Sequence, residues 1–170
     1  MAARCRRPCL AVNPNDPARS EKFIGEVQEA ATRFSVQLHI LRAGTEADIE
    51  SALAGFSQLK AGALVVGADA FYNANSKLLA EASLRHKVPT IYEYTEFTDA
   101  GGLMSYGGNI KESYRWAGIY TGRILKGARP ADLPVQQSTT VELIVNLKTA
   151  KALGITVPLS LLGRADKIIE

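Results

Sequence analysis

ALVVGAD, residues 63–69, is the stretch of sequence that decides the fold. Consecutive apolar residues that end at a glycine are typical of a central parallel strand, which is buried on both faces of its sheet. Parallel neighbours need crossover connections, and these are usually helices. We therefore expect an α/β sheet whose strands alternate with helices along the chain.

The sequence on the amino-terminal side of this segment has the expected alternation. Residues 9–12 form a predicted strand that runs into a turn rich in proline and asparagine, where Asp16 can cap a helix and Pro17 suits its first position. In the helix that follows, Phe23, Val27 and Phe34 recur at helical spacing and form one apolar stripe. A second strand is expected at residues 36–40, where apolar and polar residues alternate.

The alternation continues through the rest of the chain. Thr45, with Asp48 three residues later, resembles a capping box that opens the second helix. The elements expected after residue 69 are a helix at 76–86, a strand at 89–94, a helix at 111–126, a strand at 141–145 and a final amphipathic turn through Ile168. This order predicts the α/β class with a parallel, doubly wound sheet.

Composition excludes several classes of protein. The 170 residues are 46% hydrophobic and 22% charged, which is ordinary for one globular domain. The formal net charge is +3, and much of it comes from Arg4, Arg6 and Arg7 at the start of the chain. The remaining sequence is close to neutral, so we expect no nucleic-acid partner, which would require a basic stripe on a folded face.

The first residues and the cysteines also carry information. MAARCRRPCLAVNP has a basic start but lacks the apolar core and the small-residue cleavage site of a secretory signal peptide. Cys5 and Cys9 have no second cysteine pair to complete a zinc site, and His39 and His86 are far away in the sequence. We expect neither a metal nor an organic cofactor.

Candidate ligand contacts follow the strands, because ligands of open parallel sheets bind beyond the carboxyl ends of the strands. Amides, carboxylates, hydroxyls and aromatic rings at these positions suit a small polar or amphipathic solute. The candidate residues are Asn13, Asn15, Asp69, Phe71, Glu93, Tyr94, Ser105 and Tyr106.

Each candidate also has a purely structural interpretation. Asn13 and Asn15 lie beside prolines and are common turn formers. Asp69 could cap the next helix, although Asn75 or Ser76 looks better placed for that role. Glu93 could be an exposed charge at a strand end, and the aromatic residues could complete the core.

The sequence contains none of the common catalytic motifs. There is no glycine-rich phosphate loop after a strand, no nucleophile elbow and no zinc-protease helix. Asp69 and Glu93 on adjacent strand ends are the one pair that could serve acid–base catalysis. We expect a binding protein that is not an enzyme, and a self-standing α/β regulatory or small enzymatic domain is the alternative.

Several longer strings of the sequence resemble one family. They are VNPNDP, ALVVGADAFYN, VPTIYEYTEFTDAGGLMSYGGN, AGIYTGRILKGARPADLPVQQ and VELIVNLKTAKALGITVP. In these strings the sequence is similar to the ABC transporter substrate-binding proteins often labelled as tryptophan/tyrosine transport components, whose members have two lobes of the type I periplasmic-binding fold. The likeness covers nearly all of residues 10–170 and corresponds to the second half of the family.

The resemblance implies a division of the chain. Residues 1–9 would be a start outside the family, and residues 10–100 with 136–170 would form the C-terminal lobe. Residues 103–133 would cross over and pack a helix on an N-terminal lobe that this chain does not contain. The candidate residues after the first, third and fourth strands would line one wall of the cleft between the lobes, with Ser105 and Tyr106 at the hinge.

The resemblance also implies a function and partners. The chain would be a partial solute-binding component of an ABC importer, with a small solute such as an amino acid and the importer's permease as partners. Members of the family act in the periplasm or elsewhere outside the cytoplasm. Because the helix at 111–126 has too many apolar residues for one narrow stripe, we expect self-association as a homodimer through this helix.

Overall fold

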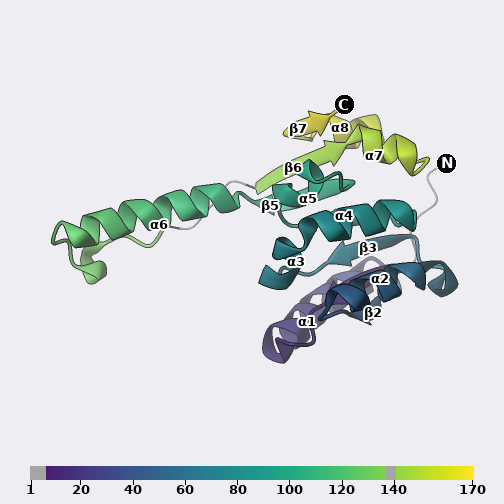
Figure 1. Ribbon diagram of the computed structural model, residues 1–170, viewed down its shortest axis with the longest axis horizontal. Helices are drawn as coiled ribbons and strands as arrows, with labels where there is room; N and C mark the ends of the chain where they lie inside the picture. The colour runs from purple at the N-terminus through teal and green to yellow at the C-terminus, as the bar shows by residue number, and fades with distance from the viewer. Residues whose placement is uncertain (1–6, 137–140) are drawn as a thin grey trace.

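The computed structural model describes residues 7–136 and 141–170 and shows, within them, a seven-stranded sheet of order β2-β1-β3-β4-β5-β6-β7 (Figure 1). The strands are β1 (Pro8–Val12), β2 (His39–Arg42), β3 (Ala63–Val66), β4 (Thr90–Tyr92), β5 (Met104–Gly108), β6 (Val141–Asn146) and β7 (Lys167–Ile169). The α-helices are α1 (Pro17–Arg33), α2 (Glu46–Ala54), α3 (Ala70–Ala74), α4 (Ser76–Arg85), α5 (Thr95–Asp99), α6 (Ile110–Leu125), α7 (Leu147–Ala152) and α8 (Leu159–Leu162). Two short 3-10 helices, η1 (Phe56–Leu59) and η2 (Pro130–Asp132), complete the described elements.

The apolar segment at residues 63–66 is a central strand, as expected. β3 pairs in parallel with β1 on one side and with β4 on the other. Leu64 and Val66 are almost fully buried, at 2% and 3% exposure, but Ala63 and Val65 on the other face are only half-buried, so the expected burial on both faces is only partly correct. The predicted α/β class with a mostly parallel sheet is confirmed.

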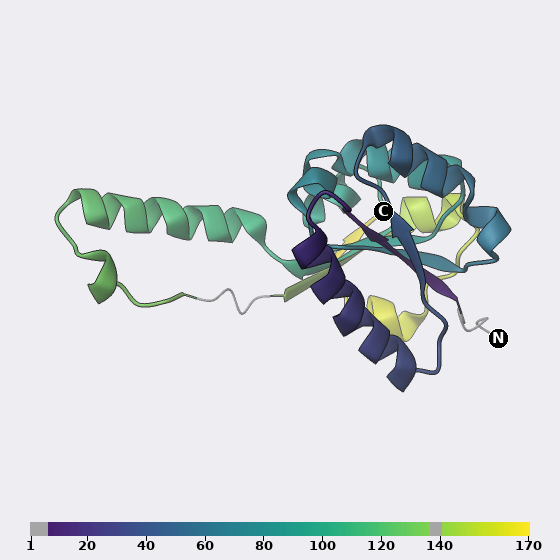
Figure 2. The same ribbon diagram turned by 90° about the horizontal axis from the view of Figure 1, so that it is seen from below.

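The main core lies on one face of this sheet. Helices α2, α4 and α5 cover that face, and α1 lies on the opposite face (Figure 2). The large side chains of this core include Ile49, Leu53, Tyr72, Leu79, Tyr92 and Phe97. On the other face, α1 buries only Ser20 and Ala31 among its own residues. The apolar stripe predicted for α1 is therefore only partly correct, because Phe34 follows the helix end and is 79% exposed.

Side-chain caps fix the starts of three helices. Asp16 accepts a hydrogen bond from the backbone N–H of Arg19, and Pro17 occupies the first helical position of α1. Thr45 and Asp48 form the predicted capping box of α2. Asn146 caps α7 by accepting from the backbone N–H of Thr149.

The structure corrects the expected topology at the carboxy-terminal side. β6 pairs antiparallel with β5, so the sheet is not wholly parallel. After β5 the chain runs outward through α6 and then returns to lie beside β5. Strand β6 therefore runs in the direction opposite to that of β5. The final segment is also different from the predicted amphipathic turn, because Lys167–Ile169 forms the edge strand β7 beside β6. Asp166 holds this segment by accepting from the backbone N–H of Leu143 at 2.7 Å.

Helix α6 forms an arm that extends away from the sheet (Figure 1). None of its residues is buried. The returning segment is tied to it by the hydroxyl of Tyr120, which donates to the carbonyl oxygen of Pro134. Trp116 contacts the same tyrosine ring edge-on at 6.1 Å, and the Arg123 guanidinium lies 5.9 Å from the ring centroid. The arm thus has its own small aromatic cluster.

The described strands can be compared with the predicted division of the chain into a lobe and a crossing segment. β1 begins at Pro8, and residues 1–6 of the expected amino-terminal start lie outside the described residues. Residues 104–108, assigned in advance to the crossing segment, are a full strand of the sheet. Residues 137–140 of the return also lie outside the described part of the chain. The division into a lobe and a crossing segment stays a prediction.

Gly102→Ala tests the packing of α5 on the sheet. An added Cβ would lie 2.3 Å from a ring carbon of Phe97, which has no exposed surface and cannot move aside. We expect the free energy of unfolding to fall by roughly 1–3 kcal/mol, measured by urea unfolding with circular dichroism. Gly118→Ala in the exposed arm is the matched control, since nothing lies within 4 Å of its added Cβ. Equal stability of Gly102→Ala and the parent would contradict this packing.

Candidate binding cleft at the strand ends

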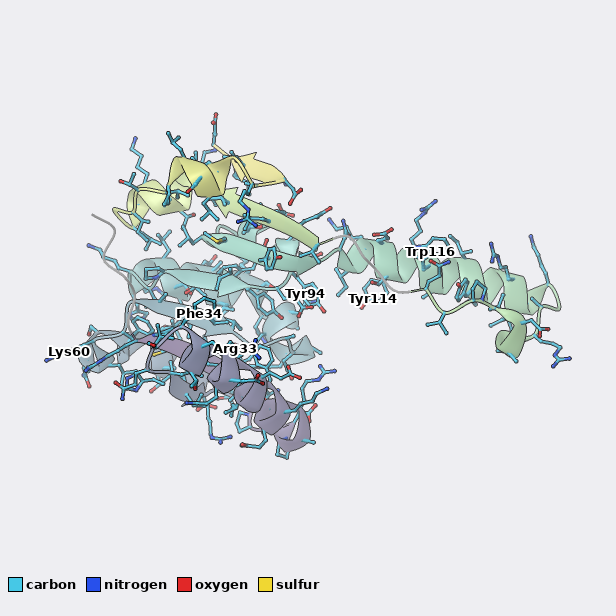
Figure 3. The ribbon with its side chains drawn as sticks, turned by 180° about the vertical axis from the view of Figure 1, so that it is seen from behind. Arg33, Phe34, Lys60, Tyr94, Tyr114 and Trp116 are labelled. Carbon is cyan, nitrogen blue, oxygen red and sulfur yellow. The ribbon has the colours of Figure 1, made fainter. Side chains whose placement is uncertain are left out.

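A solvent-open cavity of about 890 Å³ lies beyond the carboxyl ends of β3 and β4. Its walls come from α1, the loop before α3, α3 itself, the end of β4 and the first turns of α6. Figure 3 shows Tyr94 at the sheet and Tyr114 at the near end of the arm, where the lobe and the arm meet. The cavity therefore occupies the position where open parallel sheets bind ligands.

Asp69 organises the loop on one side of this cavity. Its Oδ1 accepts from the backbone N–H of Phe71 at 2.8 Å and from Nδ2 of Asn13 at 3.0 Å. The Tyr92 hydroxyl donates to the Asp69 carbonyl oxygen at 3.1 Å. Asp69 is thus the cap of α3, a helix that the sequence did not predict. Asn75 occupies the N-cap position of α4, as expected, but its side chain makes no capping hydrogen bond there and donates instead to the Phe71 carbonyl oxygen.

The two asparagines after β1 hold the loop in which they lie. Oδ1 of Asn13 accepts from the backbone N–H of Asn15, and Nδ2 of Asn15 donates to the Gly44 carbonyl oxygen, both at 3.0 Å. Asn13 is buried, and neither residue lines the large cavity. Their observed hydrogen bonds are those of turn formers, and a ligand contact through either one remains a prediction.

Glu93 is the most perturbed carboxylate of the cleft. Its Oε2 is buried and makes no hydrogen bond with any described residue. Burial raises the pKa of Glu93, and a hydrogen bond with Tyr94 and the positive charge of Arg19 only partly offset this effect. Gly107 allows β5 to approach, because a Cβ there would lie 2.4 Å from the Glu93 carbonyl oxygen.

The remaining candidates lie apart from the large cavity. Ser105 is 1% exposed, and its hydroxyl faces that of Thr98 at 3.4 Å, while its position at a hinge stays a prediction. Phe71 packs against Tyr72 with ring centroids 5.4 Å apart. Tyr106 is 59% exposed and lines a second, more apolar groove of about 470 Å³. Glu93 lines both cavities.

The structure therefore brings Asp69, Glu93 and Tyr94 together, out of the eight predicted residues. Sequence reasoning missed the walls that α1, α3 and the arm supply, because residues of these helices do not directly follow a strand, and it missed Ala68 after β3, whose side chain has no polar group. The cavity-lining residues that were missed are Ala18, Arg19, Lys22, Phe23, Glu26, Ala68, Ala70, Asn73, Ala74, Ile110 and Tyr114. For α1 a signal existed, since a helix that follows β1 must begin at the same sheet edge as the cleft.

Within residues 7–136 and 141–170, no three side chains of histidine, cysteine, aspartate or glutamate are grouped so as to hold a metal ion. In the same ranges, no helix has the length and apolar character needed to cross a membrane.

An open, mostly parallel α/β sheet with a cavity at its strand ends is an arrangement that commonly binds small ligands. The model of the ABC transporter substrate binding protein family matches residues 7–169, and the chain belongs to this family. No curated protein sequence matches the chain significantly.

Solved structures support the fold. A conserved domain protein from Vibrio cholerae has a TM-score of 0.82 at 23% identity, and the match covers 96% of this chain and 54% of that one. An ABC domain from Streptococcus pneumonia, in complex with L-Trp, has a TM-score of 0.81 at 24% identity, with coverage of 96% and 56%. A ligand-free, open substrate binding protein from Clostridium difficile has a TM-score of 0.66 at 20% identity, with coverage of 98% and 55%. The chain thus spans about half the length of each.

Glu93→Gln tests the electrostatics of the cleft. A carboxyl whose pKa is higher in the folded than in the unfolded protein destabilises the fold as it ionises, so stability is greatest below the ordinary pKa of 4.5 and falls as the pH rises through the raised pKa. We expect the variant to unfold at a higher temperature than the parent at pH 7 and at the same temperature near pH 4, as measured by calorimetry. Glu96→Gln removes the same charge from α5 as a control. A pH-independent difference would contradict the assignment.

Proposed function

We propose that this chain is part of the solute-binding component of an ABC importer and captures a small solute, of the size of an amino acid, in the cavity at the strand ends. The observation that carries the proposal is the cavity itself. Its volume of about 890 Å³ falls within the range of small-molecule sites. Carboxylate, amide and guanidinium groups stand beside two tyrosines and Phe23, which suits an amphipathic solute.

The family membership supports the transport role. On this proposal the importer's permease is the macromolecular partner, and the protein acts in the periplasm or elsewhere outside the cytoplasm. The alternative is a self-standing regulatory or small enzymatic α/β domain. A catalytic pair of Asp69 and Glu93 finds little support, because Asp69 already accepts from Asn13 and from the Phe71 backbone and caps α3.

The position of the arm supports the proposed division of the chain. Residues 10–100 and 136–170 would form one lobe, and residues within 103–133 would cross to a further lobe of the complete family fold. Ile110 and Tyr114 line the cavity from the first turns of α6. A second lobe packed on the arm would then face the same cavity and close it. One wall alone should hold a solute weakly, because enclosure on both sides supplies much of the affinity.

Solute binding can be measured on the 170-residue chain by NMR. We expect small solutes with an apolar body to shift the backbone resonances of Ala68, Tyr94 and Tyr114, with dissociation constants weaker than about 1 μM. Tyr94→Ala should remove most of this response, because the ring supplies part of the apolar wall. Tyr106→Ala, in the neighbouring groove, is the control. A panel of amino acids, amines, carboxylates and nucleobases without any such shift would contradict the proposed function.

The arm gives a separate prediction about assembly. Tyr114 and Leu125 in the arm are 71% and 83% exposed, and Val135 in the returning segment is 98% exposed. The arm and its returning segment thus carry apolar surface of the kind that usually marks an interface. We propose that a second copy of the 170-residue chain covers it. Light scattering over a dilution series should show dimers at high micromolar concentration, and Leu125→Lys should weaken them.

The chain offers a matched control for this experiment. Leu159 in α8 is 85% exposed, almost the same as Leu125, but lies outside the arm. Leu159→Lys should leave the association unchanged. A parent protein that stays monomeric at every concentration would refute the dimer.

A further inference from the structure

One side of the sheet is only partly covered by helices. Figure 2 shows α1 in purple and α8 in yellow on this side, and Figure 3 views the same side directly. Right-handed crossovers explain the gap, because the steps from β2 to β3, β4 and β5 proceed in one direction and so place α2, α4 and α5 on the other side. No described helix between β2 and β5 therefore covers the α1 side of β3, β4 and β5.

Side-chain burial marks the same gap. Leu10 of β1 is in register with Val65, Val65 with Ile91, Ile91 with Met104, and Met104 with Val145 of β6. Residues in register point to the same face of a sheet. Leu10 and Val145 at the two flanks have no exposed surface, whereas the three residues between them are only half-buried. The open strip is thus three strands wide.

The strip leads into the second groove, of about 470 Å³, whose lining includes Phe23, Val65, Ile91, Tyr106 and Val141. Tyr106 and Val141 are 59% and 49% exposed. Three strands about 4.8 Å apart span about 10 Å, which is the diameter of an α-helix. The groove therefore suits one apolar helix end laid against the strands.

Helix α6 has the surface that this groove requires. It is 16 residues long, and none of its residues is buried. Its tip carries Ile124 and Leu125, which are 41% and 83% exposed. The arm extends away from its own lobe (Figure 1), so its tip is presented to the groove of another copy and not to its own.

Charge favours the same pairing. Glu93 is the one charged residue among the described residues that line the groove. Residues 110–126 carry one acidic side chain, Glu112, against four basic ones. The basic ones are Lys111, Arg115, Arg123 and Lys126. A cationic helix is attracted to a groove whose charged lining is acidic.

We propose that the tip of α6 docks in the second groove of another copy, an inference that specifies the contact of the dimer proposed above and rests on it. The two copies exchange arms about a twofold axis, so that each groove receives the arm of the other chain. Leu125 lies against Tyr106 and Val141. The dimer is closed, because neither an arm nor a groove is left over.

Photochemical cross-linking tests which surface the tip meets. Leu125 is replaced by p-benzoylphenylalanine, and this chain is mixed with an excess of isotopically labelled parent chain before irradiation. We expect cross-links to labelled peptides that contain Ile91, Tyr106 or Val141, identified by mass spectrometry. The same probe at Phe34, which is 79% exposed but follows the far end of α1, should give no cross-link to these peptides.

Tyr106→Glu tests the groove without changing the arm. It should weaken dimerisation about tenfold or more, as Leu125→Lys does, in light scattering over a dilution series. Phe34→Glu, at another exposed aromatic residue, should leave dimerisation unchanged. Mixing the Tyr106→Glu chain with the Leu125→Lys chain should restore association, because one contact is then native and the other joins the introduced lysine to the introduced glutamate.

The other outcomes separate the exchange from the dimer itself. Cross-links confined to the chain that carries the probe would show an arm folded back on its own lobe and overturn the exchange. Dimers that resist Tyr106→Glu and cross-link only between arms would also overturn it, while leaving the proposed dimer intact. A parent chain that stays monomeric at every concentration would refute the dimer and the exchange together.

Discussion

Burial of β3 between two parallel neighbours is the constraint on which the rest of the structure depends. Its backbone groups pair with β1 and β4, and its side chains Leu64 and Val66 are buried in the main core, while Ala63 and Val65 on the opposite face are half-buried. A parallel pair cannot be closed by a tight turn, so each neighbour requires a crossover that carries the chain back to the other end of the sheet. The helices α1, α2 and α4 meet this requirement, and all strand-end loops then gather at one edge.

Those loops are fixed by hydrogen bonds from the core. Tyr92, buried in β4, reaches the carbonyl oxygen of Asp69, and Tyr72 in α3 reaches that of Ala43 after β2. Burial raises the pKa of both hydroxyls, so they remain protonated donors at neutral pH. The loop after β3 is thus held by the neighbouring strand. A rigid loop of this kind lets one wall of a cleft keep its shape without a bound solute.

Glu93 places a carboxylate in the cleft, and that position is unfavourable for the stability of the fold. The residue continues β4, and the close approach of β5 at Gly107 keeps its carboxylate partly shielded from water. An ionised group in that position lowers stability, and groups with such environments are common in functional sites. The arm adds the complementary feature, since α6 buries none of its own residues but places Tyr114 beside the same cavity. The features that lower stability, a shielded carboxylate and an unburied helix, therefore lie where a solute or a partner would bind.

Sequence alone determined the parts of this protein that depend on local chemistry. The apolar run at 63–66, the Thr45–Asp48 capping box and the cap at Asp16 each follow from spacing and side-chain type, and the α/β class follows from their order. Asp69, Glu93 and Tyr94 were found because they directly follow strands. Tertiary structure alone decided the antiparallel return of β6, the pairing of β7 and the convergence of Arg19, Asn73 and Tyr114 on one cavity. Such features depend on which distant segments become neighbours, and no periodicity within a single segment encodes that choice.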